Sequence, residues 1–146
     1  MKTKIRAMVA AASLLVFLAT IGWATASFAQ TPTTSIKTKL IGNWELVSVL
    51  LNQTAPYGEN PRGTMTFDAN GHFSVIVLSG GRARNISYYG TYTVNDSDSS
   101  MTIHIDGSSL PHENGRDLKR KLAFNGDELV VESPNGNVQL TWKRAS

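Results

Sequence analysis

The feature that most constrains the fold of this chain is a two-residue apolar periodicity, which recurs in short runs from residue 42 to residue 144. In the run 72–78, for example, Phe73, Val75 and Val77 alternate with residues of another face. Because successive side chains of a β-strand point to opposite sides, this alternation predicts strands with one buried face. Asn-Gly pairs separate several of the runs, and glycine supplies the positive φ that tight hairpin turns need.

Eight such runs follow one another, joined mostly by short connections. Such strands pair antiparallel with their chain neighbours, which predicts an all-β fold, an eight-stranded antiparallel up-and-down β-barrel. An interior closed by eight strands is filled by side chains or holds one small ligand. A two-sheet sandwich is the alternative. The predicted strands are residues 42–51, 63–68, 72–78, 88–94, 101–106, 117–124, 128–133 and 138–144.

Residues 1–29 have the pattern of a secretory signal peptide. A basic start precedes an apolar stretch that is short for a membrane span, and small residues follow it. We expect cleavage after Ala29 or, as the second choice, after Ala26. The basic residues of this start are Lys2, Lys4 and Arg6.

The polar, proline-containing residues 30–39 predict a flexible arm with one helical turn near residues 35–40, and residues 40–146 form the barrel domain. The chain has no cysteine, so an exported form has no disulfide and no lipid-modified cysteine. We therefore expect a periplasmic or secreted protein, without stable membrane insertion after cleavage of the signal peptide.

The charge balance argues against a nucleic-acid partner. The chain has 14 Lys and Arg and 11 Asp and Glu, and three of the basic residues lie in the predicted signal peptide. The remaining chain is formally neutral, whereas a nucleic-acid binder keeps a basic excess to neutralise phosphates. We expect a small apolar or amphipathic molecule as the partner.

Several stretches resemble the bacterial lipocalin-like domain family, of calycin type. Gly42-Asn43-Trp44 matches the Gly-x-Trp that opens the first strand of lipocalins. The resemblance spans nearly the whole chain after the signal peptide and implies a small-molecule barrel, without a general ligand or reaction. The other matching stretches are Leu40-Ile41, Glu45-Leu46-Val47-Ser48, Pro56-Tyr57-Gly58-Glu59-Asn60-Pro61-Arg62-Gly63, Asp68-Ala69-Asn70-Gly71-His72, Tyr89-Gly90-Thr91-Tyr92-Thr93-Val94, Arg120, Phe124-Asn125-Gly126-Asp127 and Leu140-Thr141-Trp142-Lys143-Arg144.

The same resemblance implies a structural pair at the closed end of the barrel. Trp44 occupies the position of the lipocalin tryptophan that plugs this end, and Arg144 that of the arginine that packs over it. A cation–π contact and hydrogen bonds from the guanidinium to carbonyl groups then seal the first strand to the last.

Strand parity selects candidates for a ligand site inside the barrel. Arg120 shares the apolar face of its run, so its guanidinium is expected to point into the barrel and to anchor an acidic ligand. The alternatives are an internal salt bridge and an arginine that reaches out at the barrel mouth. Phe73, Tyr88 and Tyr92 are inward aromatic residues, which stack on an apolar ligand or belong to the core.

Three further candidates are less directly placed. The loop 56–63 is expected to cover the open mouth, with Tyr57 and Arg62 facing a bound molecule, or to pack on the rim. His104 has outward parity between apolar neighbours, and only a partly polar lumen turns it inward. His72 and His112 are expected to be solvated, and the three histidines match no metal-site spacing.

The chain contains no nucleophile elbow, phosphate-binding loop or paired-carboxylate motif. We therefore expect no catalytic residue, no cofactor and no metal, and we favour binding of a small, largely apolar, and in one version acidic, molecule in the lumen. The alternatives are a barrel enzyme of isomerase or cyclase type, a secreted enzyme inhibitor and a structural envelope protein.

Overall fold

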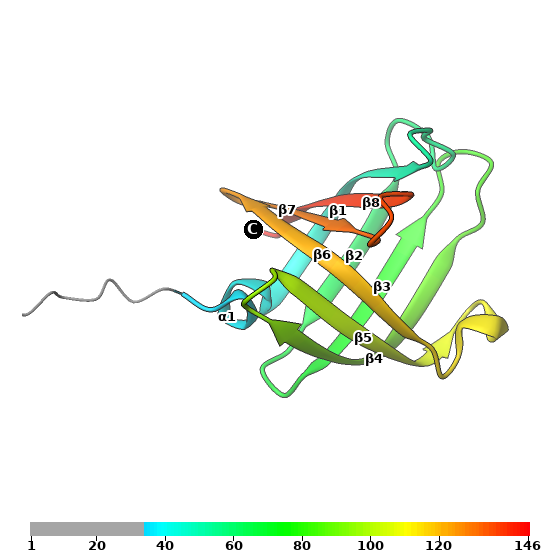
Figure 1. Cartoon of the computed structure of the whole chain (residues 1–146). Helices are drawn as coiled ribbons and strands as arrows, with labels where there is room; N and C mark the ends of the chain where they lie inside the picture. The colour runs from blue at the N-terminus through cyan, green and yellow to red at the C-terminus, as the bar shows by residue number, and fades with distance from the viewer. Residues whose placement is uncertain (1–33) are drawn as a thin grey trace, which may run out of the picture. The chain divides into compact units, whose positions relative to one another are not determined.

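The computed structural model describes residues 34–146, which form a closed barrel of eight antiparallel strands in chain order (Figure 1). Each strand pairs with its chain neighbours, and β1 also pairs with β8. The predicted up-and-down barrel is confirmed, and the sandwich alternative is wrong. The strands are β1 (Gly42–Leu51), β2 (Arg62–Phe67), β3 (His72–Leu78), β4 (Ile86–Asn95), β5 (Ser100–Ser108), β6 (Asp117–Asn125), β7 (Glu128–Glu132) and β8 (Val138–Arg144).

The alternation of apolar and other residues in the sequence corresponds to an alternation of buried and exposed side chains along the strands. In β3, Phe73, Val75 and Val77 are buried while the residues between them are exposed. The inward apolar side chains of all eight strands form one core, because a closed barrel has a single interior. Predicted strand ends differ from the observed ones by no more than two residues.

The pairing has two register shifts, one between β1 and β8 at Leu46–Ser48 and one between β4 and β5 after Tyr89. A β-carbon on Gly90 would overlap the carbonyl oxygen of His104 on β5. Only glycine allows the two backbones to approach this closely, and such shifts bend strands at the corners of barrels.

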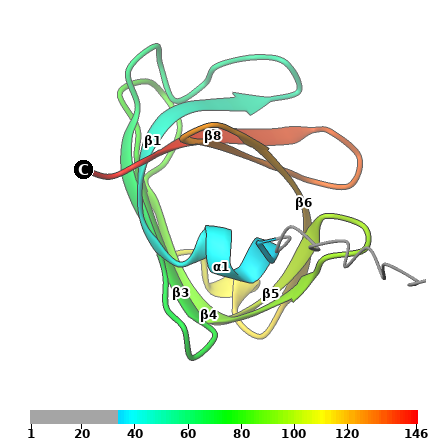
Figure 2. The same cartoon turned by 90° about the vertical axis from the view of Figure 1, so that its left-hand side faces the viewer.

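A short helix, α1 (Ile36–Leu40), lies across one end of the barrel, as seen along the barrel axis in Figure 2. The predicted helical turn is therefore present. Ser35 caps it, because its hydroxyl accepts a hydrogen bond of 3.3 Å from the Thr38 amide. Leu40 is fully buried, and its carbonyl accepts a hydrogen bond of 2.9 Å from the Trp44 indole. This end of the barrel is closed.

Arg144 joins α1 to the two strands that close the barrel. Trp44 and Arg144 are register partners in β1 and β8, and the Arg144 Cζ lies 4.1 Å from the centroid of the Trp44 ring. The guanidinium also donates to the carbonyl of Lys39 and, over 3.0 Å, to that of Ile41. One side chain thus holds the first strand, the last strand and the helix together.

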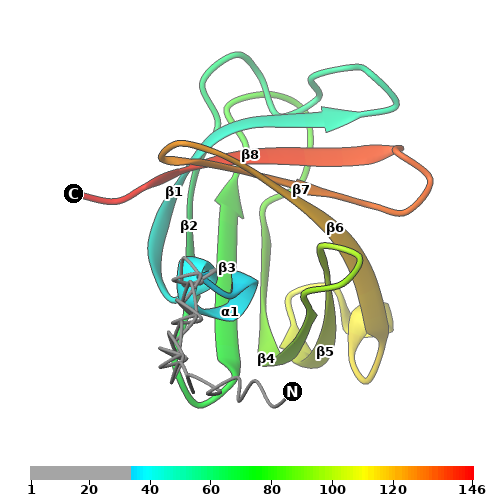
Figure 3. The same cartoon turned by 60° about the vertical axis from the view of Figure 1, so that its left-hand side comes forward.

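The loops at the other end are longer. Figure 3 shows the β1–β2 loop (52–61) and the β3–β4 loop (79–85) at the end away from α1. The short 3₁₀ helix η1 (Pro111–Glu113), between β5 and β6, belongs to the same end. This end contains the mouth of the cavity described below.

The predicted signal peptide, residues 1–29, lies outside the described residues, as does the first part of the predicted arm. Among residues 34–146, no helix is long and apolar enough to cross a membrane.

Replacement of Arg144 by alanine is expected to lower the free energy of unfolding by about 2–4 kcal/mol, because a cation–π contact and two charged hydrogen bonds are lost. Denaturant unfolding measures the change. Lys143→Ala, at the exposed neighbouring position, is the control and is expected to change stability by no more than about 0.5 kcal/mol. Equal effects of the two substitutions would show that Arg144 has no special role.

Candidate functional site

The barrel interior contains a cavity of about 250 Å³. Side chains from every strand line it, and most of them are aliphatic or aromatic. Its volume lies just below the range of about 300–1,000 Å³ that is usual for small-molecule sites. The lining residues are Val49, Leu51, Tyr57, Met65, Phe67, Phe73, Val75, Val77, Ile86, Tyr88, Met101, Ile103, Ile105, Ser108, Leu110, Glu113, Leu118, Arg120, Val131, Val138, Leu140 and Trp142.

An aromatic group forms part of the cavity wall. The rings of Phe73 and Tyr88 meet edge to face, with centroids 5.9 Å apart, and Phe73 stacks on Phe67 at 6.2 Å. Both residues of the first pair were expected to face the lumen, and both line the cavity. Such a wall offers flat apolar surface to a ligand.

Arg120 lines the cavity from β6, on the same face as Leu118 and Leu122, as strand parity predicts. Its Nη1 donates a hydrogen bond of 2.8 Å to the Lys119 carbonyl. Within residues 34–146, no carboxylate forms a salt bridge with its guanidinium. The internal salt bridge considered as one alternative is therefore not formed. Arg120 is partly exposed, so its remaining guanidinium donors are open to solvent or to another acceptor, and an arginine that reaches out at the mouth stays the alternative to the anchor.

Tyr88 places a phenol beside this charge. Burial raises the pKa of the Tyr88 hydroxyl above its ordinary value, and the positive charge of Arg120 acts against that rise. The hydroxyl therefore carries its proton at neutral pH and is a hydrogen-bond donor. Arg120 and Tyr88 together present donors to an anion or carbonyl group.

Glu113, at the end of η1, is the acidic residue that lines the cavity. Its Oε1 accepts a hydrogen bond of 2.9 Å from Arg116 and lies 3.2 Å from Nε2 of His112. The Arg116 guanidinium offsets the charge of Glu113, whereas Arg120 lacks a carboxylate partner among the described residues. The electrostatic balance of the mouth is therefore positive.

Tyr57 forms the cover of the cavity and is only 4% exposed. Its loop is fixed to the β3–β4 loop by backbone hydrogen bonds: the Gly80 amide donates to the Tyr57 carbonyl over 3.0 Å, and the Arg82 amide to the Pro56 carbonyl over 3.2 Å. A β-carbon on Gly81 would lie 2.6 Å from the Pro56 oxygen. We call this pair of joined loops the latch.

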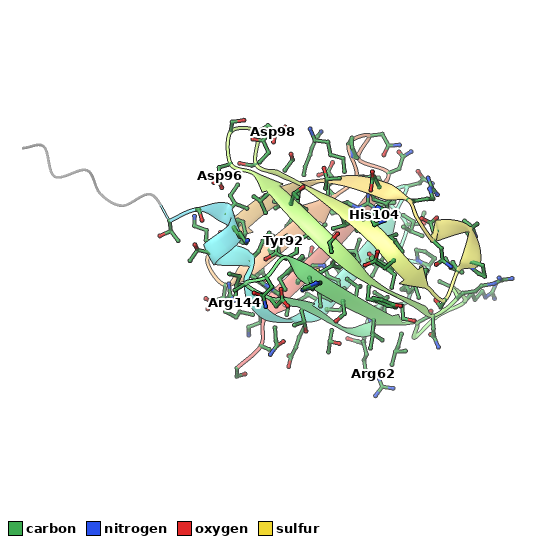
Figure 4. The ribbon with its side chains drawn as sticks, turned by 90° about the horizontal axis from the view of Figure 1, so that it is seen from below. Arg62, Tyr92, Asp96, Asp98, His104 and Arg144 are labelled. Carbon is green, nitrogen blue, oxygen red and sulfur yellow. The ribbon has the colours of Figure 1, made fainter. Side chains whose placement is uncertain are left out.

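Three predicted site residues do not line the cavity. Arg62 is exposed and projects away from the barrel (Figure 4). His104 lies on the outer face, where its Nδ1 is 2.7 Å from the Asp117 carboxylate, because Ile103 and Ile105 take the inward positions. Strand parity correctly predicted that His104 faces outward, and the inclusion of His104 among the lumen residues was wrong.

Tyr92 is the third. It is buried, but it packs edge to face on Phe67 and its hydroxyl donates a hydrogen bond of 2.7 Å to the Asp68 carbonyl. Burial, and then the charge of Asp68, raises the pKa of its phenol. Tyr92 thus ties the core to the β2–β3 turn, which is the core role considered for it.

Several lining residues were not among the predicted site residues. Parity identifies inward residues such as Met65 and Leu118, but it does not show which of them border empty space. Ser108 is the last residue of β5, beyond the end of the predicted strand 101–106, and Glu113 belongs to η1, which has no periodicity to interpret. Trp142 also lines the cavity, and its Nε1 is buried without a hydrogen-bond partner among the described residues.

No group of three or more histidine, aspartate or glutamate side chains in the described part of the chain is arranged to hold a metal ion.

Comparison with known proteins gives similarity of structure only. No protein-family model matches the chain, and no curated protein matches its sequence. A DUF4847 family protein from Bacteroides vulgatus is 12% identical with a TM-score of 0.48, over 73% of this chain and 94% of that one. An uncharacterized protein from Bacteroides eggerthii is 12% identical with a TM-score of 0.46, over 73% of this chain and 99% of that one.

Gly81→Ala is expected to separate the two loops of the latch, because the new β-carbon cannot remain 2.6 Å from the Pro56 oxygen. Hydrogen exchange at the amides of Gly80 and Arg82 should then become at least tenfold faster, since an opening free energy lower by about 1.4 kcal/mol gives that factor.

Gly80→Ala is the matched control, because a β-carbon there meets its nearest atoms at 3.4 and 3.5 Å, which is ordinary contact. Exchange in this variant, followed at the Arg82 amide, should stay close to that of the parent protein. If both variants exchange alike, close approach at Gly81 does not hold the latch.

Proposed function

We propose that this protein is an exported, lipocalin-like barrel that binds a small, largely apolar molecule in its cavity. The observation that supports this most directly is the pairing of an aliphatic and aromatic lining with one cavity-facing charge, Arg120, that has no salt-bridge partner among the described residues. An apolar pocket with few polar groups is the usual form of a small-molecule site.

The distribution of polar groups gives the proposed ligand an orientation. Arg120 and Tyr88 donate hydrogen bonds to an acidic or carbonyl-bearing head, and the apolar body lies against Phe73, Met65 and Ile103. Tyr57 covers the bound molecule from the latch. A charge-assisted hydrogen bond in a largely apolar surrounding is stronger than one in water, so the head contributes to selectivity.

The cavity supports binding over the scaffold alternatives. A secreted inhibitor or a structural envelope protein requires only a filled barrel with suitable loops, whereas a lining that leaves about 250 Å³ unfilled gives up dispersion contacts in the core. An isomerase or cyclase needs polar groups that meet at a reacting atom. No observation of the described residues favours this alternative, so we retain binding.

The proposal predicts selective loss of acid binding in Arg120→Gln. The neutral dye N-phenylnaphthylamine reports occupation of the cavity, and octanoate and octanol compete with it. Arg120→Gln should weaken the binding of octanoate about tenfold, which corresponds to one charged hydrogen bond of about 1.4 kcal/mol. The affinities for the dye and for octanol should stay within about twofold of those of the parent protein.

Lys121→Gln, an equal loss of charge at the exposed neighbour on the outer face of β6, should leave all three affinities unchanged. Equal weakening of acid and alcohol by Arg120→Gln would contradict the anchor role. Failure of the parent protein to bind either the dye or octanoate would contradict cavity binding for ligands of this kind.

A further inference from the structure

Besides Arg116, which pairs with Glu113, the mouth end of the barrel carries three exposed arginines: Arg62 at the start of β2, and Arg82 and Arg84 in the latch. None of them forms a salt bridge with a carboxylate of residues 34–146. The two loops of the latch contain one acidic residue, Glu59. Arg62 extends away from the barrel (Figure 4).

Exposed apolar side chains adjoin these charges. Leu78, 39% exposed, is the register partner of Arg62, and Ile76, 46% exposed, is the register partner of Thr64. Both also border an outer groove that residues of β1, β2 and β3 line, with Glu45 as its acidic residue. Arg82 and Arg84 follow Leu78 in the chain within a few residues. We call these five residues, Arg62, Ile76, Leu78, Arg82 and Arg84, the basic edge.

The basic edge is a local excess of positive charge, since residues 30–146 as a whole are formally neutral. Acidic residues gather in the turns of the opposite end: Asp68 in the β2–β3 turn, Asp96 and Asp98 in the β4–β5 turn, and Asp127 in the β6–β7 turn. Basic side chains accompany them there, since Lys119 pairs with Asp98 and both Lys37 and Lys143 are exposed. The basic edge is therefore distinguished by its lack of salt bridges within residues 34–146, not by a charge difference between the two ends of the barrel.

We propose that the basic edge binds the surface of an anionic lipid bilayer, with the mouth of the barrel facing the membrane. Each arginine near such a surface is attracted to its negative potential, and neighbouring aliphatic side chains enter the headgroup boundary. A nucleic acid also attracts the arginines, but it offers nothing to Ile76 and Leu78. The apolar component of the edge therefore favours the bilayer.

Binding to a membrane surface goes beyond the proposed function. One consequence of it, for the delivery of a ligand to the cavity, rests on the proposed function. A largely apolar ligand partitions into bilayers, so a mouth held at the membrane surface shortens the path of the ligand to the cavity. The latch, which carries Arg82 beside the Tyr57 cover, is then the part of the protein nearest the lipid.

The test measures sedimentation of the purified protein with vesicles of phosphatidylcholine alone or mixed with phosphatidylglycerol. The protein is expressed from its full coding sequence, and all variants share one N-terminus, so a contribution of that segment is common to them. The parent protein is expected to bind the anionic vesicles and not the neutral ones. Arg82→Glu/Arg84→Glu should weaken this binding about tenfold or more.

The charge-matched control is Lys37→Glu/Lys143→Glu, which makes the same change of charge at exposed positions of the α1 end. It should bind within about twofold of the parent protein. Ile76→Ser/Leu78→Ser should weaken binding severalfold, which a purely electrostatic attraction would not predict. Thermal unfolding of each variant verifies that the fold is intact.

The proposal is overturned if the parent protein ignores anionic vesicles, if the two charge variants lose binding equally, or if the apolar variant binds as the parent does. Dye binding separates this result from the proposed function. Arg82→Glu/Arg84→Glu should retain the dye in the cavity, because neither side chain lines it. If the parent protein binds anionic vesicles but does not bind the dye, only the proposed cavity function is overturned.

Discussion

Pairing between β1 and β8 is the interaction on which the rest of this structure depends. An eight-stranded meander leaves two edges unpaired unless its first and last strands meet, and the described barrel has all eight strands paired on both sides. The register of this seam brings Arg144 opposite Trp44, so that a single side chain can close the seam and fix α1 over the end of the barrel. Closure also creates the interior in which every inward side chain must find a place.

Side-chain size decides how that interior is divided. Near α1, the indole of Trp44, the ring of Phe124 and the side chain of Leu40 occupy the available space, and the two rings lie 6.4 Å apart. Toward the mouth, the inward positions of β1, β3 and β5 carry smaller residues such as Val49, Val77 and Ile105, and the cavity opens there. The candidate site is therefore a consequence of side-chain sizes around the whole barrel, because the aromatic wall and the shorter aliphatic side chains together leave the cavity between them.

This division explains which features the sequence could predict. Alternation identifies strands and their inward faces, so the barrel, the orientation of Arg120 and the lumen position of Phe73 follow from residues a few positions apart. The cavity depends on volumes summed over eight strands, which no local pattern contains. Glu113 lies in a segment without periodicity, and Tyr92 has the parity of a lining residue but is used to bind the Asp68 carbonyl. His104 is the opposite case, since its parity was informative and an assumed polar lumen overrode it.

The charges of the mouth connect the cavity with the outer surface. A guanidinium that faces an apolar cavity has a desolvation cost, which falls when the group remains near water or when an anion approaches it. Arg120 is only partly buried, and Arg116 offsets the charge of the nearby Glu113, so the positive field of Arg120 is not cancelled from within the mouth. The arginines of the basic edge have the same sign and lie at the same end. An anionic headgroup outside the barrel and an acidic ligand inside it would thus meet one continuous electrostatic environment, which attracts both toward the mouth.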